Sequence, residues 1–111
     1  MRQSIFTKKP SMNYFNNHPI IPLGEIIISP GVSNLGIDPT PLLRRHQECD
    51  WSQMCAEDVE LNKQALANGE AIVSRYHVTT PMRESVMVTI VTEDDRSYTL
   101  IFMEDEAAPA G

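Results

Sequence analysis

The sequence predicts a single α+β domain in which an antiparallel sheet of three or four strands carries two or three helices on one face. The 111 residues have the length of one domain. Alternating apolar residues after position 70 indicate consecutive strands, and helix start and stop signals lie between positions 29 and 69. Because strands that are neighbours in sequence usually pair, the expected order of elements is β-α-α-α-β-β-β.

The domain is expected to span residues 23–104, between a tail of residues 1–22 and a tail of residues 105–111. The first tail holds Pro, Asn, Ser and Lys without a hydrophobic period, and it is either mobile or laid over the domain by Tyr14 and Phe15. The second tail is acidic and then rich in Ala, Pro and Gly, which is typical of a frayed end.

Residues 23–28 contain three consecutive isoleucines and predict a short strand. The run suggests burial on both faces, so this strand is expected inside the sheet and not at an exposed edge. Ser29 and Pro30 then favour a short helix over residues 30–35, with the serine as its cap.

A second helix is expected to run to residue 47, with Thr40 as its N-cap and Pro41 at its first helical position. A third helix is expected over residues 55–67, with the pair Asn68-Gly69 as its end signal. Its inward stripe contains Asn62 among apolar residues. A buried amide must find hydrogen-bond partners, so we interpret Asn62 as a tether for a loop or a strand end. The alternative is that this amide binds a ligand.

Three further strands are expected after the helices. Residues 70–78 form the first, and residues 84–103 hold the other two, joined by an acidic loop. We predict a three-residue loop over residues 93–95, because it pairs Ile90 with Tyr98 and places the apolar residues on one face. One aspartate of this loop then takes a left-handed backbone conformation. The opposite face is itself apolar and contains Met87, Val91, Ile101 and Met103.

The chain carries a net charge of −6, and acidic residues dominate its second half. Direct nucleic-acid binding is not expected, because no basic face is available to neutralise phosphates. An acidic face suits a basic partner, although solvated acids that maintain solubility are the simpler explanation. No apolar run approaches membrane-spanning length, and no signal peptide is evident. Two cysteines do not make a disulfide framework, so a cytoplasmic protein with reduced thiols is expected.

A series of short blocks lies along most of the domain: Leu42-Leu43-Arg44-Arg45-His46, Asp50-Trp51, Glu57-Asp58, Asn62, Ala65-Leu66, Gly69, Ser74-x-Tyr76 and Thr92-Glu93-x-Asp95-Arg96-Ser97. With these blocks the chain resembles a group of small bacterial proteins associated with plasmids and other mobile elements, which carry segments like RHxxGDWG and ITEADRS. It departs from that pattern at Glu48-Cys49 and at Ser52, where the group tends to have glycine. The resemblance implies a mobile-element accessory protein and does not imply an enzyme.

His46, Cys49 and Cys55 carry side chains that bind zinc, but zinc needs three or four ligands, usually in two tight pairs. The fourth would be His77 on a distant strand, so no metal and no other cofactor is expected. Cys49 beside His46 is a candidate nucleophile with Asp50 orienting the ring, but nothing supplies a recognisable oxyanion site. A helix-end histidine and two ordinary buried thiols are the simpler explanation.

Two further features carry a functional interpretation and a structural one. Glu93, Asp94 and Asp95 suit acid–base or cation chemistry, but aspartate also stabilises turns by bonding its own backbone. Trp51 either closes the end of the core, with Asp50 capping the following turn, or lies exposed as a contact residue for a protein partner.

Two classes of function follow from these residues. The first is a small non-enzymatic protein that acts by contact with a protein partner, such as a host restriction or CRISPR complex. Its predicted contact residues are Asp50, Trp51, Glu93, Asp94, Asp95 and Arg96. The second is a ligand-binding protein or minimal enzyme, and its predicted residues are His46, Asp50, Asn62 and Arg96. We favour the first, because the sequence contains no complete set of catalytic residues. A deep pocket that joins the four residues of the second would reverse this preference. A third hypothesis is a homodimer through the apolar outer face of the sheet.

Overall fold

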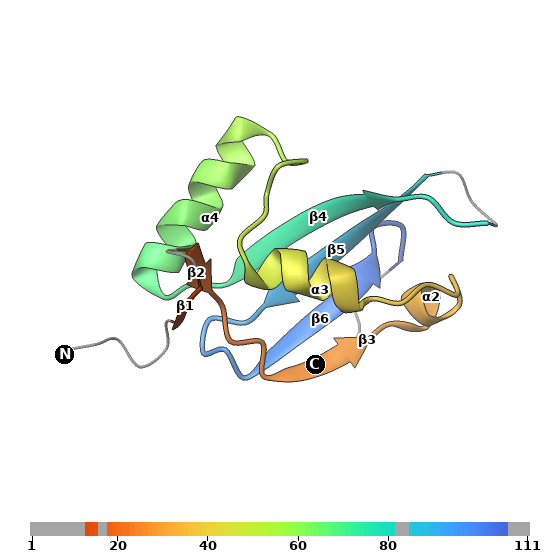
Figure 1. Cartoon of the computed structure of the whole chain (residues 1–111), viewed down its shortest axis with the longest axis horizontal. Coiled ribbons are helices and arrows are strands. Elements are labelled where there is room, and N and C mark those ends of the chain that lie inside the picture. Colours follow the sequence, from red (N-terminus) through yellow and green to blue (C-terminus); the bar gives the residue numbers. More distant parts are fainter. Residues whose placement is uncertain (1–12, 16–17, 82–84, 107–111) are drawn as a thin grey trace.

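The computed structural model describes residues 13–15, 18–81 and 85–106 (Figure 1). Its elements are β1 (Asn13–Phe15), β2 (His18–Ile20), β3 (Glu25–Ile28), α2 (Pro30–Ser33), α3 (Thr40–Gln47), α4 (Ala56–Asn68), β4 (Ile72–Val78), β5 (Val86–Thr92) and β6 (Tyr98–Met103). The predicted α+β class and the order β-α-α-α-β-β-β, from β3 to β6, are confirmed. In this part of the chain no helix has both the length and the apolar character needed to span a membrane.

The main sheet has four strands in the order β3-β6-β5-β4. β4, β5 and β6 form the expected antiparallel meander, whereas β3 pairs with β6 in parallel. The sheet is therefore mixed and not purely antiparallel as expected. The reason is topological, because the three helices carry the chain across the sheet between β3 and β4, and the last strand returns beside β3 in the same direction.

β3 lies at the edge of the sheet, and the prediction of an internal strand is wrong. Ile26 is 42% exposed and Ile28 is 40% exposed. The isoleucines indicate a β-strand correctly, but the burial of a strand depends on neighbours that its own sequence does not define. β1 and β2 form a separate antiparallel two-stranded sheet before the domain.

The register of β5 and β6 differs from the predicted one. Ile90 lies opposite Ile101, so the three-residue loop is wrong. The connection spans residues 93–97, and its left-handed residue is Arg96, with φ 60°, instead of an aspartate. Arg96 N donates to Glu93 O at 2.9 Å and closes the turn.

The observed register directs Thr99, Ile101 and Met103 toward the helices. Thr99 is fully buried, and its hydroxyl lies 2.7 Å from Thr92 Oγ1 and 2.7 Å from Leu23 O. The prediction assumed that only apolar side chains face the core, but a buried hydroxyl with hydrogen-bond partners is tolerated there. Ile101 and Met103 therefore do not belong to the outer face of the sheet.

The two faces of the main sheet differ in burial. α3 crosses in front of β5 and β6 on the inner face (Figure 1), where the buried residues are Ile72, Ser74, Tyr76, Val86, Val88, Ile90, Thr92, Thr99, Ile101 and Met103. The opposite face, which we call the outer face, consists of Ile27, Val73, Arg75, His77, Met87, Thr89, Val91, Tyr98, Leu100 and Phe102. Most outer-face side chains remain partly exposed. The helices thus cover one face only.

The N-terminal boundary of the packed structure lies before residue 23. Ile21 is fully buried against Trp51, Ala65 and Ile72 in a second, smaller core cluster. Its backbone N–H donates to Gln47 O at 2.9 Å. The segment ahead of β3 is therefore part of the core, although it has no hydrophobic period in the sequence.

The C-terminal boundary likewise lies beyond residue 104. The Glu106 carboxylate accepts hydrogen bonds from Ser29 Oγ at 2.5 Å and from Met103 N at 2.9 Å. The hydrogen bond from Ser29 is the main cause that lowers the pKa of Glu106. Predictions about residues 1–12 and 107–111, and about the side chains of Tyr14 and Phe15, lie outside the described residues.

Candidate functional site

A continuous chain of buried polar groups crosses the inner face of the sheet. His46, near the end of α3, is fully buried. Its Nδ1 lies 2.6 Å from Ser74 Oγ on β4, and its Nε2 lies 2.7 Å from Thr92 Oγ1 on β5. Trp51 Nε1 donates to Ser74 Oγ at 3.0 Å. On the other side, Thr92 Oγ1 lies 2.7 Å from Thr99 Oγ1 on β6.

The direction of each hydrogen bond in this buried polar series can be worked out from its last member, Thr99 on β6. Leu23 O only accepts, so the Thr99 hydroxyl donates to it. Thr99 Oγ1 then accepts from the Thr92 hydroxyl, which has a single proton. Thr92 Oγ1 must accept in turn from His46 Nε2. The ring of His46 therefore carries its proton on Nε2.

With the proton on Nε2, the neutral ring of His46 accepts at Nδ1 from the Ser74 hydroxyl. Ser74 Oγ itself accepts from the indole of Trp51. Burial lowers the pKa of His46 to about 4, and the nearby charge of Arg96 contributes in the same direction. At neutral pH the ring is uncharged and both nitrogens are occupied. No ring nitrogen of His46 is free to bind a ligand or to transfer a proton.

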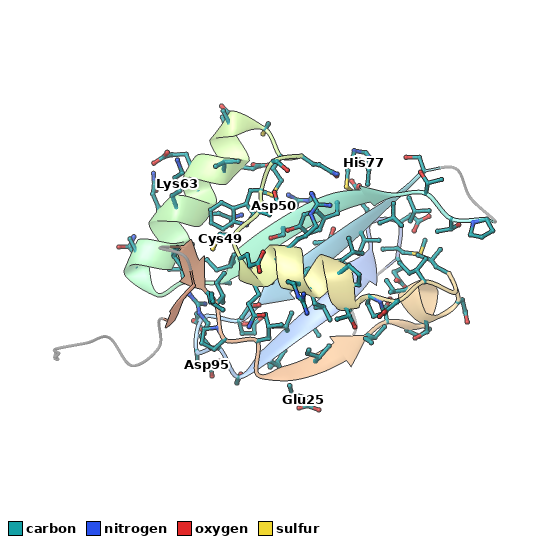
Figure 2. All side chains as sticks on the ribbon, viewed as in Figure 1. Glu25, Cys49, Asp50, Lys63, His77 and Asp95 are labelled. Carbon is teal, nitrogen blue, oxygen red and sulfur yellow. The ribbon has the colours of Figure 1, made fainter. Side chains whose placement is uncertain are left out.

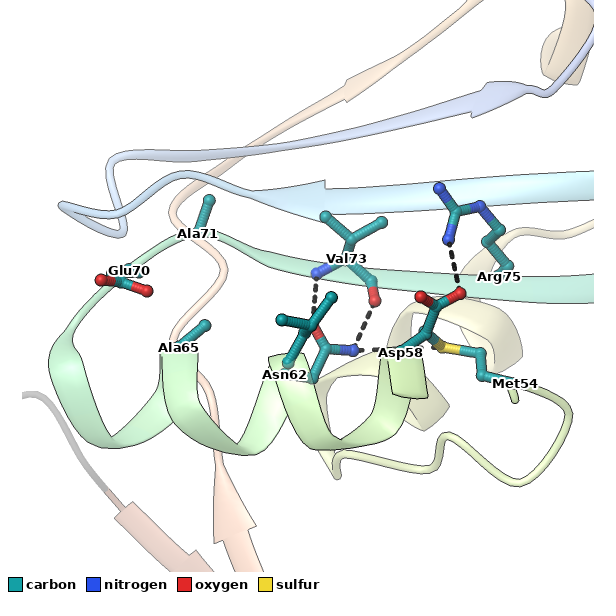
Figure 3. Close-up of a pocket in the computed structure, with 9 residues that line it drawn as sticks. Met54, Asp58, Asn62, Ala65, Glu70, Ala71, Val73 and Arg75 are labelled. Atoms are coloured by element: carbon teal, nitrogen blue, oxygen red, sulfur yellow. Dashed lines mark hydrogen bonds and ion pairs between the residues drawn. The ribbon is translucent and has the colours of Figure 1, made fainter. Parts of the chain in front are cut away.

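Asn62 holds the outer edge of β4. Its Nδ2 donates to Val73 O at 2.6 Å, and its Oδ1 accepts from Val73 N at 3.1 Å, so one amide side chain takes the place of a neighbouring strand (Figure 3). The interpretation of Asn62 as a tether for a strand is confirmed. Both polar atoms of the amide are used, which leaves little capacity for a ligand.

Gln53 plays a similar part further along the same edge. Its Oε1 accepts from His77 N at 2.7 Å. Val73, Arg75 and His77 are the residues of β4 whose backbone groups point away from β5, and side-chain amides bind both groups of Val73 and the N–H of His77. The β4 edge is thereby blocked on both sides of Arg75.

A shallow groove of about 310 Å³ lies between α4 and β4. Asp58 and Arg75 form an ion pair across it at 3.7 Å, and Asn62 lies at its floor beside Val73 (Figure 3). Neither this groove nor the hollows at Val86, Met87, Glu104 and Asp105 and at Asp38, Thr40, Pro41, Arg44, Arg45 and Glu48 joins His46, Asp50, Asn62 and Arg96. The pocket that would favour the ligand-binding hypothesis is not among them.

Trp51 and Asp50 act within the fold. Trp51 is only 8% exposed, so it closes the core and presents little surface to a partner. Asp50 Oδ1 accepts from Ser52 N and Ser52 Oγ, which is the expected cap of the following turn. Its Oδ2 accepts from Arg45 Nε at 2.8 Å, and this hydrogen bond is the main cause that lowers the pKa of Asp50.

The acidic loop is stabilised by its own backbone. Asp95 Oδ1 accepts from Ser97 N at 3.0 Å, as expected for turn chemistry. Arg96 Nη1 donates to Glu70 O at 2.8 Å and to Glu93 O at 2.9 Å, so Arg96 links the loop to the connection between α4 and β4. Figure 2 shows Asp95 at one end of the sheet and Asp50 above its middle. The predicted contact residues therefore do not form one continuous surface.

The two cysteines differ in environment. Cys49 is half-buried with a positive φ of 61°, and burial is the main cause that raises its pKa to about 11. The thiol is protonated at neutral pH, which makes it a poor nucleophile. Cys55 is exposed at the N-terminal end of α4. Among the described residues, His, Cys, Asp and Glu form no group of three or more that could hold a metal ion.

The outer face is the functional candidate that the sequence did not define correctly. Its apolar side chains come from all four strands of the main sheet: Ile27, Val73, Met87, Val91, Leu100 and Phe102. An alternating pattern does indicate that β5 and β6 have two apolar faces. Which residues of β5 and β6 lie on the outer face depends, however, on the register of these two strands, and in the observed register the hydroxyl of Thr99 is buried.

No protein-family model matches this chain, and the searches of curated proteins and of solved structures find no match either.

Proposed function

We propose that this protein is a non-enzymatic accessory protein that acts by binding a protein partner through the outer face of its main sheet. The observation that carries this proposal is the apolar surface that four strands build on the side away from the helices. Its apolar side chains are half-buried or, at Leu100, buried, and a contiguous apolar patch on one face is typical of protein interaction sites. The net charge of −6 and the resemblance to mobile-element proteins favour a cytoplasmic setting and a host defence complex, of the restriction or CRISPR type, as partner.

The polar residues that could serve an enzyme are engaged within the fold. His46 and Asn62 use their polar atoms on hydrogen bonds to strands, and Arg96 binds two backbone carbonyl groups. Asp50 binds Arg45 and Ser52. Because these polar groups already have partners inside the protein, they support a structural role for these residues and a binding role for the surface.

The outer face has the composition of an interface core with a polar border. Leu100 is only 7% exposed at its centre, with Val91 and Phe102 half-buried on the neighbouring positions. Arg75 and His77 lie toward the β4 side of the same face. Apolar side chains at the centre with charged residues at the rim are typical of protein interfaces.

Affinity capture from nuclease-treated bacterial lysate tests this proposal. The variants Val91→Lys and Phe102→Lys place a charge on the outer face, and Leu61→Lys, at a position 62% exposed on α4, is the matched control. Circular dichroism and thermal unfolding verify that each variant is folded. We expect one protein to be captured by the wild type and the control and to be lost with both outer-face variants. Equal capture by folded outer-face variants would contradict the proposal.

A further inference from the structure

β3 presents an unpaired backbone edge. Glu25 N donates at 3.0 Å to O of Ser97, the residue before β6. In a parallel pair, the hydrogen bonds to one neighbour come from alternate residues, so the backbone groups of Ile26 and Ile28 point away from the sheet. Within the part of the chain that the structure describes, these groups have no protein partner. β3 is therefore an open edge.

The side chains of this edge are apolar. Ile26 is 42% exposed and Ile28 is 40% exposed, and both lie on the side of the sheet that carries the helices. Ile27 points to the outer face. Glu25 is the sole charged residue of β3 and lies at its first position. An unpaired edge with exposed isoleucines and an uncharged centre is a surface for the addition of another strand.

We propose that a second copy of this chain pairs with β3 in antiparallel orientation, with a two-fold axis at Ile27. The two main sheets then form one continuous sheet. This interaction uses the edge of the sheet and leaves the outer face available, so it is separate from the function proposed above.

The register follows from the direction of the backbone groups. In an antiparallel pair, residues whose groups point toward the partner must lie opposite each other and exchange both hydrogen bonds. Ile26 therefore lies opposite Ile28 of the second copy, and Ile28 lies opposite Ile26 of the second copy. The two copies of Ile27 form the close, non-hydrogen-bonded pair at the axis. All outward groups of both isoleucines then have partners.

The symmetry of this edge is the reason for a second copy as occupant. The two outward-facing residues lie symmetrically about Ile27, so the edge is complementary to itself in hydrogen bonding and in side-chain shape. No two charged residues lie opposite each other, because Glu25 falls opposite Ser29 of the second copy. An unrelated strand would need the same spacing of apolar residues to use this edge equally well.

The ends of the paired strands carry like charges. The Ser29 hydroxyl binds the Glu106 carboxylate, so Glu25 of one copy approaches Glu106 of the other. Salt screens such repulsion between exposed charges. The dimer should therefore become tighter as the ionic strength increases. A three-residue ladder is shorter than a standard interface, so we expect dissociation constants in the micromolar range.

Sedimentation equilibrium and light scattering test the pairing on the full chain from about 1 μM to about 1 mM, a range that covers micromolar dissociation constants. The wild type should approach twice the monomer mass of 12.5 kDa. The double variant Ile26→Lys/Ile28→Lys places lysines against each other across the axis and should remain monomeric. Leu61→Lys, at another exposed apolar position, should dimerise like the wild type.

A cross-link tests the register independently of any loss of folding in the lysine variant. In a background with Cys55→Ser, the variant Ile27→Cys places two thiols at the axis, where the Cβ atoms of such a pair are about 4.5–5.5 Å apart. Mild oxidation should convert this variant to a covalent dimer. Leu61→Cys in the same background should not cross-link at the same rate.

Three results would overturn the proposal. The first is a wild type that stays monomeric over the whole concentration range. The second is a dimer that persists in the folded double-lysine variant, or that is lost instead with Val91→Lys, which would place the contact on the outer face. The third is equal cross-linking of Ile27→Cys and Leu61→Cys.

Discussion

The two edges of the main sheet are finished in different ways. At the β4 edge, the side-chain amide of Asn62 binds both outward backbone groups of Val73, and that of Gln53 binds the N–H of His77. At the β3 edge, the outward backbone groups of Ile26 and Ile28 have no hydrogen-bond partner among the described residues. Unpaired edges are places where other chains add, and proteins usually protect them. The difference indicates that side chains of the same chain block the β4 edge on both sides of Arg75, whereas the β3 edge is available for pairing.

The buried polar chain connects these two edges, and its disruption should have the largest effect. It runs from Trp51 and Ser74, on the β4 side, through His46 to Leu23, which precedes β3. The folded state holds His46 neutral, with a pKa lowered from 6.5 to about 4. The unfolded chain therefore binds a proton first as the pH falls. Stability should be highest above pH 6.5 and should decrease by about 3 kcal/mol between pH 6.5 and pH 4.

Urea unfolding at pH values from 7.5 to 4.5 measures this decrease. His46→Asn should be less stable at pH 7.5 and should lose the pH dependence in this window, whereas exposed His77→Gln should keep it. The carboxylates of Asp50, Asp95 and Glu106, whose pKa values are lowered, affect stability at lower pH. Equal slopes for wild type and His46→Asn would show that His46 is not the titrating group.

Removal of Asn62 should open the closed edge. Asn62→Ala leaves the N–H and C=O of Val73 without their partners, which should decrease the free energy of unfolding by about 2 kcal/mol. Amide hydrogen exchange at Val73 should accelerate, and self-association through β4 should appear. Gln64→Ala, at an exposed position on the same helix, is the control and should change little. A variant as stable as the control would contradict the role of Asn62.

Gln53→Ala should have a smaller effect on the same edge. The N–H of His77 lies near solvent, so water replaces the lost amide and the expected decrease in stability is about 0.5–1 kcal/mol. Hydrogen exchange should accelerate at His77 and remain unchanged at Val73. Acceleration at both residues would mean that the two amides protect the edge as one cooperative unit.

Changes at the open edge should have the smallest effect on the fold of the monomer. In Ile26→Lys/Ile28→Lys, the lysine methylene groups cover the same surface while the ammonium groups reach water. The thermal stability of the monomer should change by about 0.5 kcal/mol or less, because no internal hydrogen bond is lost. A large destabilisation would show that the isoleucine side chains of β3 are needed inside the core, and that this edge is less available than its exposure indicates.

Local signals in the sequence predicted α2 and α4 well, whereas the expected N-cap of α3, Thr40, is the first residue of that helix and Pro39 precedes it as the cap. Ser29 caps α2 by accepting from Val32 N, and Gly69 ends α4 with a left-handed φ of 70°. Such signals act within one turn of helix, so no distant residue is needed to interpret them. Asn62 was also predictable as a tether, because an amide in an apolar helical stripe must find partners.

The register and the edges required information from distant residues. Thr99 faces the core because its hydroxyl donates to Leu23 O and accepts from the Thr92 hydroxyl, and neither partner can be inferred from the alternation of residues in β6. The isoleucines of β3 suggest a buried strand. Among the strands that the structure describes, its only neighbour in the main sheet is β6, the last strand in the sequence, so β3 lies at an edge. Pairing at this sequence separation depends on the path of the helices between β3 and β4.

The α+β class, the order of the elements, the ends of α2 and α4 and the need of Asn62 for a partner all follow from the amino-acid sequence. Hydrophobic period and capping chemistry operate over a few residues, which is why these features follow from the chain alone. Three other properties become visible only in the folded protein: which face of β6 is buried, which edge of the sheet is covered by side chains, and that His46 is held neutral. These properties depend on hydrogen-bond partners that come from other strands and helices, and those groups meet only when the chain is folded.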